Sequence, residues 1–70
     1  RAGYSVPEII SLLDHMLAHH RHHIKDLREM HNAIECAGHN DASSHLHEAI
    51  SIFESGNEKI AEALRIIRGE

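Results

Sequence analysis

The sequence predicts an all-α fold, an antiparallel two-helix hairpin with helices over about residues 6–37 and 41–68 that forms a four-helix bundle as a homodimer. Apolar residues recur at alternating spacings of three and four along two long segments, which is the pattern of helices that pack along a seam. A glycine separates the two segments. The 70 residues form one domain, 1–70, and a chain this short usually needs a disulfide, a metal or a partner subunit to be stable.

The first helix has clear signals at both ends. Ser5 can accept a hydrogen bond from the backbone of Glu8 while the Glu8 side chain reaches back, and Pro7 suits the first turn. Gly38 supplies the left-handed residue that commonly ends a helix. The seam between these signals comprises Ile10, Leu13, Leu17, His20, Ile24, Leu27, His31 and Ile34.

The second helix can be capped by Asn40 or Asp41. Its seam comprises Leu46, Ile50, Phe53, Asn57, Ile60, Leu64 and Ile67. The run from Ser55 to Asn57 also has the composition of a turn, but the seam keeps its phase through it, which favours one continuous helix. When the chain folds back at the glycine, the two seams pair in layers. We then expect His23 beside Gly56, and opposite charges near each other on the other edge, Arg21 near Glu54 and Asp14 near Arg68.

Composition narrows the classes of function. The single cysteine, Cys36, excludes a disulfide within the chain. The formal charge is -4 and the basic residues are dispersed, which argues against a nucleic-acid partner. No apolar run approaches the roughly 20 residues of a membrane span, so we expect a soluble protein, cytoplasmic or periplasmic, without a membrane partner.

Nine histidines occur, five of them between positions 15 and 23. Heptad phase places His20 and His23 toward the seam, His20 opposite Asn57 and His23 opposite Gly56. Residues three apart on one helix can bind one metal together, and the same pair from a second chain would complete four imidazoles for zinc, copper or nickel. His19, four residues before His23, is the nearest auxiliary ligand, and Asn57 would orient the ligands. The alternative is a neutral core His20 that is hydrogen-bonded to Asn57 and fixes the register.

Two other groups are weaker candidates for metal ligands. The outward line of His15, His19, His22 and Asp26 offers neighbouring chelating pairs, or else forms a solvated face that responds to pH. Near the turn, His31, Glu35, Cys36 and His39 lie close together, with His47 folding back onto them. For this second group the alternative is an ion pair between Glu35 and His47.

The chemistry favours a metal-binding protein without catalysis, acting in storage, delivery or sensing of a transition metal. The sequence lacks Glu-x-x-His and Cys-x-x-Cys-His, and nothing positions a nucleophile. A rival interpretation is a structural or interaction module whose dimer binds a larger protein partner and whose histidines respond to pH. A third is a haem-binding bundle in which His20 or Met16 holds the iron.

Overall fold

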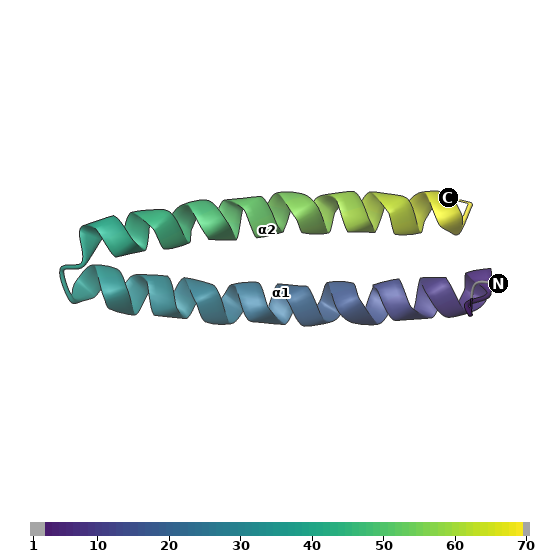
Figure 1. Cartoon of the computed structure of the whole chain (residues 1–70), viewed down its shortest axis with the longest axis horizontal. Coiled ribbons are helices and arrows are strands. Elements are labelled where there is room, and N and C mark those ends of the chain that lie inside the picture. Colours follow the sequence, from purple (N-terminus) through teal and green to yellow (C-terminus); the bar gives the residue numbers. More distant parts are fainter. Residues whose placement is uncertain (1–2, 70) are drawn as a thin grey trace.

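The structure is a computed structural model that describes residues 3–69 as two antiparallel helices joined by a tight turn (Figure 1). Helix α1 spans Val6–Cys36 and α2 spans Asn40–Ile67. Each predicted helix boundary lies within one residue of these bounds, and α2 is unbroken through Gly56. The hairpin measures 50 × 20 × 19 Å. The ends of the predicted domain, residues 1–2 and 70, lie outside the described range.

The ends of α1 form as predicted, whereas the start of α2 does not. Glu8 donates its backbone N–H to Ser5 Oγ at 3.3 Å, and Ser5 donates its own to Glu8 Oε1 at 2.9 Å. Gly38 has a φ of 88°, in the left-handed region. The predicted cap of α2 at Asn40 or Asp41 is wrong, because the turn is so short that His39 is the N-cap, without a side-chain hydrogen bond.

The core is a narrow line between the two helices. The buried apolar residues of the described range are Leu17, Ile24, Ile50 and Leu64. On α2, buried side chains recur every seven residues and alternate in character, in the order Ser43, Ile50, Asn57 and Leu64. Other predicted seam residues stay accessible, and Phe53 is 53% exposed. Within residues 3–69 each helix packs against the other alone, so apolar side chains such as Met16, Met30 and Phe53 remain accessible.

Ion pairs follow one side of the hairpin. Asp14 pairs with Arg68 as predicted, and Glu54 pairs with Arg28. Arg21 lies near Glu54 as predicted, since both line one cavity, but the partner of Glu54 is Arg28. The two pairs fit one antiparallel register. Asp14 and Arg28 lie fourteen residues apart on the first helix, and their partners Arg68 and Glu54 lie fourteen residues apart on the second. In that register Arg21 is level with the uncharged Ala61.

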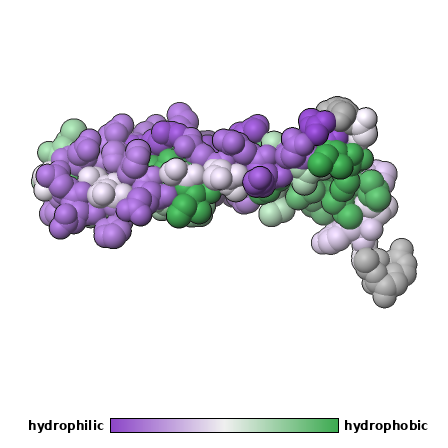
Figure 2. Space-filling model, turned by 90° about the horizontal axis from the view of Figure 1, so that it is seen from above, coloured by the Kyte–Doolittle hydropathy of each residue, from purple (hydrophilic) through white to green (hydrophobic). Residues whose placement is uncertain are grey.

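The other side of the hairpin carries accessible apolar side chains. Met16 is 46% exposed and Met30 is 56% exposed, and the two flank His23 at intervals of seven residues, so all three lie on one side of α1. We call the surface formed by Met16, His20, His23, Leu27, Met30 and Phe53 the apolar face. Seen from above, the molecule is otherwise mostly hydrophilic, with hydrophobic residues gathered at the end that holds both termini (Figure 2). Within residues 3–69, neither helix has an apolar stretch of the length a membrane crossing requires.

Candidate metal-binding site

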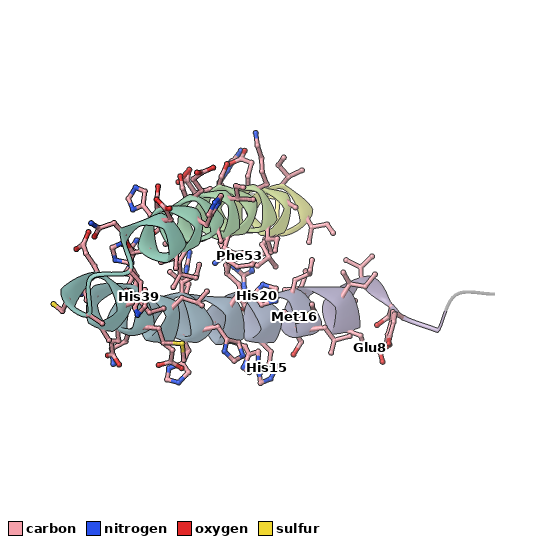
Figure 3. The ribbon with its side chains drawn as sticks, turned by 60° about the vertical axis from the view of Figure 1, so that its left-hand side comes forward. Glu8, His15, Met16, His20, His39 and Phe53 are labelled. Carbon is pink, nitrogen blue, oxygen red and sulfur yellow. The ribbon has the colours of Figure 1, made fainter. Side chains whose placement is uncertain are left out.

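The five clustered histidines occupy the middle of α1 but face different surroundings. His15, His19, His22 and His23 are exposed, and His20 is half-buried. Figure 3 shows His15 on the side of α1 away from α2, whereas His20 and Phe53 lie toward the space between the helices. The predicted division into inner and outer residues therefore holds for His20 and for the outward line. His23 is exposed, but it also lines the apolar cavity between the helices that adjoins His20.

The direct contact of the His23 ring is with His19 of its own helix. Their Nε2 atoms lie 2.8 Å apart, and the rings are nearly perpendicular, with centroids 4.3 Å apart and planes at 83°. The expected proximity of His23 to Gly56 gains no support, since a Cβ added at Gly56 would meet nothing within 4 Å. One turn of α1 thus brings two ring nitrogens together at hydrogen-bond distance, and a proton shared between them is donated by one ring and accepted by the other.

The neighbouring histidines lower the pKa of His19. The charge on a protonated His23 lowers the pKa of His19 below its ordinary value of 6.5. Desolvation and the charges of His15, His20 and His22 act in the same direction, with smaller effects. His19 is therefore held in the neutral form at neutral pH. A metal ion binds the neutral imidazole, so this environment reduces the competition between protons and metal.

His20 lies beside an apolar cavity of about 310 Å³ that opens on the apolar face. The lining consists of His20, His23, Ile24, Leu27, Phe53 and Asn57. Asn57 is 7% exposed, and its amide Nδ2 has no hydrogen-bond partner among the described residues. The hydrogen bond from this amide to His20 expected in the alternative interpretation is therefore not made. A polar donor instead lies buried next to an imidazole and an open apolar space.

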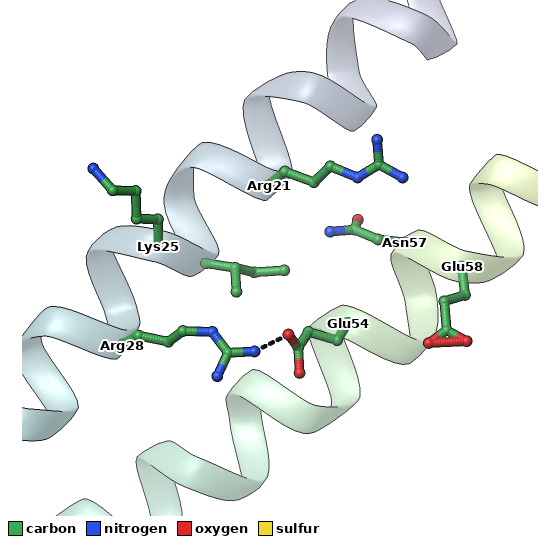
Figure 4. A pocket seen from close by; sticks show the side chains of 7 residues that line it. Arg21, Lys25, Arg28, Glu54, Asn57 and Glu58 are labelled. Atoms are coloured by element: carbon green, nitrogen blue, oxygen red, sulfur yellow. Dashed lines mark hydrogen bonds and ion pairs between the residues drawn. The ribbon is translucent and has the colours of Figure 1, made fainter.

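A second cavity, of about 530 Å³, lies on the charged side of Asn57 (Figure 4). Arg21, Lys25 and Arg28 line it from α1, and Glu54 and Glu58 line it from α2. Basic and acidic groups are mixed here, and Arg28 is already neutralised by Glu54. This cavity contains no histidine and offers no set of metal ligands.

The weaker candidates separate into two places. On the exposed side of α1, His22 Nε2 lies 3.7 Å from Asp26 Oδ2, and His15 stacks on His19 with ring centroids 6.4 Å apart. Near the turn, His31 and His47 approach each other across the two helices, with ring centroids 5.8 Å apart.

The remaining members of the turn group do not form the expected contacts. No ion pair between Glu35 and His47 is found among the described residues, and Cys36 and His39 are exposed. Throughout residues 3–69, no three histidine, cysteine, aspartate or glutamate side chains converge closely enough to hold a metal ion. One chain therefore presents pairs of ligands rather than a complete site.

Sequence reasoning gave one feature too little weight and missed another. The pairing of His19 with His23 was visible as a spacing of four residues, which faces two side chains toward each other on a helix, but heptad phase drew attention to the pair three apart. The burial of Ser43, which is 3% exposed, had no apolar signal. Its hydroxyl donates to the Asn40 carbonyl at 3.0 Å, which allows a polar residue to occupy the seam beside the turn.

Comparison with known proteins gives a family but no activity. No curated protein and no solved structure matches the chain. Residues 9–67 match a protein family described as a domain of unknown function, DUF8180. The matched segment covers nearly all of both helices and the turn between them. The chain therefore belongs to the DUF8180 family.

Proposed function

We propose that this domain binds a transition metal ion, zinc, copper or nickel, and serves in its storage, delivery or sensing without catalysis. The observation that carries the proposal is the 2.8 Å separation of the Nε2 atoms of His19 and His23. Two imidazoles bound to one tetrahedral metal at about 2.0–2.1 Å have their nitrogens about 3.3 Å apart. The pair is thus within about 0.5 Å of the spacing of two ligands, and a small rotation of the rings would aim both nitrogens at a metal ion beside them, in place of the hydrogen bond.

A second copy of the chain would complete the coordination sphere. The apolar face is the surface for this contact, because Met16, Met30 and Phe53 are each about half exposed there. His23 lies between the two methionines on the same line of α1. Two hairpins joined through this face would form a four-helix bundle, bury the apolar residues and bring two histidine pairs to one interface. Four imidazoles form a complete set for any of these three metals.

His20 and Asn57 have supporting roles in this proposal. His20 is three residues before His23, and the apolar cavity leaves its ring room to turn toward the same metal. The Asn57 amide adjoins that cavity and has an unused donor. A buried donor next to a ligand can fix the orientation of its ring, as outer hydrogen-bond partners commonly do at metal sites.

Isothermal titration of metal-free, untagged protein with zinc, copper and nickel salts tests the proposal. We expect His19→Ala/His23→Ala to remove the tightest binding, and His15→Ala/His22→Ala, a matched pair of exposed histidines on the same helix, to retain it. A site shared by two chains saturates at one metal per two chains. Equal affinities of both double variants would contradict the proposal and favour the interaction module.

A further inference from the structure

We propose a second metal site of a different kind, in which His31 of α1 and His47 of α2 bind one transition metal ion between the two helices near the turn. Glu35 is the third ligand. This site shares no residue with the His19–His23 pair and does not depend on a second copy of the chain. Its consequence is mechanical, because the metal would join the two helices of one hairpin.

The spacing of the two rings suits a shared ion. Their centroids lie 5.8 Å apart and their planes are inclined at 47°. Two imidazoles bound to the same metal at about 2.0–2.1 Å have ring centres roughly 5–6 Å apart. The backbone of the hairpin therefore already holds the rings at the separation that a bridging metal requires, and only ring rotation is needed.

A hydrogen bond prepares His31 for this role. Its Nδ1 lies 3.2 Å from Asn32 Oδ1, and an amide oxygen only accepts, so Nδ1 carries the proton of the neutral ring. The lone pair of Nε2 is then available to a metal. Metal-binding histidines commonly have this arrangement, with the ring nitrogen that does not bind the metal donating to an oxygen.

The surroundings leave space and a negative charge. Two cavities near the turn, of about 270 and 460 Å³, are lined by His31 and His47. Glu35 lines the larger one and follows His31 by one helical turn. Its side chain is exposed and does not yet converge with the two rings, so it completes the site by rotation, and water supplies the remaining ligand. The cation in the smaller cavity, Arg28, is neutralised by Glu54.

The effect of this site is measured best where the first site has been removed. In the His19→Ala/His23→Ala background, thermal unfolding is followed by circular dichroism with and without zinc. At zinc concentrations about 100 times the Kd, we expect the midpoint to rise by on the order of 10 °C. Adding His47→Ala abolishes the rise. His45→Ala is the matched control, since this exposed histidine of the same helix lines neither cavity, and it leaves the rise intact.

Two further measurements make the outcome decisive. Asn32→Ala removes the acceptor that orients His31, and we expect it to weaken zinc binding by about 10- to 100-fold in the same background. The rise in midpoint should not change when the protein is diluted tenfold, because both rings belong to one chain. The proposal is overturned if the His47→Ala variant keeps the rise, if zinc causes none, or if the rise depends on protein concentration.

Discussion

Replacing Asn57 with leucine tests the packing of the hairpin most sharply. Asn57 occupies a core position between Ile50 and Leu64 in the seven-residue repeat of α2, is 7% exposed, and has an amide nitrogen without a partner. Leaving a buried donor unpaired costs about 1–3 kcal/mol. Burying a leucine side chain contributes about 1.5–3 kcal/mol. The apolar cavity beside Asn57 has room for the larger side chain.

We therefore expect Asn57→Leu to raise the free energy of unfolding by at least about 2 kcal/mol, measured by urea unfolding at a fixed protein concentration. Ser55→Leu, an exposed substitution on the same helix, is the control and should change it by less than about 0.5 kcal/mol. A loss of more than about 1 kcal/mol in Asn57→Leu would refute the reasoning, because the amide would then have a stabilising partner in solution.

Three smaller predictions concern the helix ends, the glycines and pH. Ser5→Ala removes the capping hydrogen bond and should cost about 1 kcal/mol in urea unfolding. Gly38→Ala should lower the free energy of unfolding by about 1 kcal/mol, because Gly38 has a φ of 88°. Gly56→Ala should raise it by a similar amount, because the added Cβ meets nothing within 4 Å and alanine favours a helix. Stabilisation by Gly38→Ala and destabilisation by Gly56→Ala would contradict the left-handed turn at Gly38 and the continuous helix through Gly56. Because the pKa of His19 is lowered in the folded chain, the unfolded chain binds more protons than the folded chain as the pH falls below about 6.5. Stability without metal should thus rise with pH through this range, and His19→Ala should flatten that rise.

The helices could be predicted from the sequence because their signals are local. The capping pair of Ser5 and Glu8, the left-handed Gly38 and the continuous heptad phase each act within one or two turns, and all are observed. The continuous heptad phase also correctly predicted that α2 is unbroken at Gly56, where composition alone suggested a turn. Local signals were weaker at the start of α2, because the length of the turn, and not the identity of a capping side chain, decides where that helix begins.

The candidate site could be predicted only in part. Heptad phase separated His20 from the outward histidines, but it could not show that the single partner helix leaves His23 in the open. One partner helix covers only part of the apolar side of α1. His20 and His23 would both be covered only if a further helix packed against that side. The contact between His19 and His23 depends on side-chain rotation within one helix, and the approach of His31 to His47 depends on the register of the turn.

The metal content of the untagged protein, purified without a histidine-affinity step, tests the central claim most directly. Elemental analysis should find zinc, copper or nickel bound to the wild-type protein. The His19→Ala/His23→Ala variant should contain less metal per chain, because the ions bound by these two histidines are lost. The matched variant His15→Ala/His22→Ala should keep the wild-type content. The same metal content in both double variants, or none in the wild type even after incubation with zinc and removal of the excess, would contradict metal binding by the His19–His23 pair.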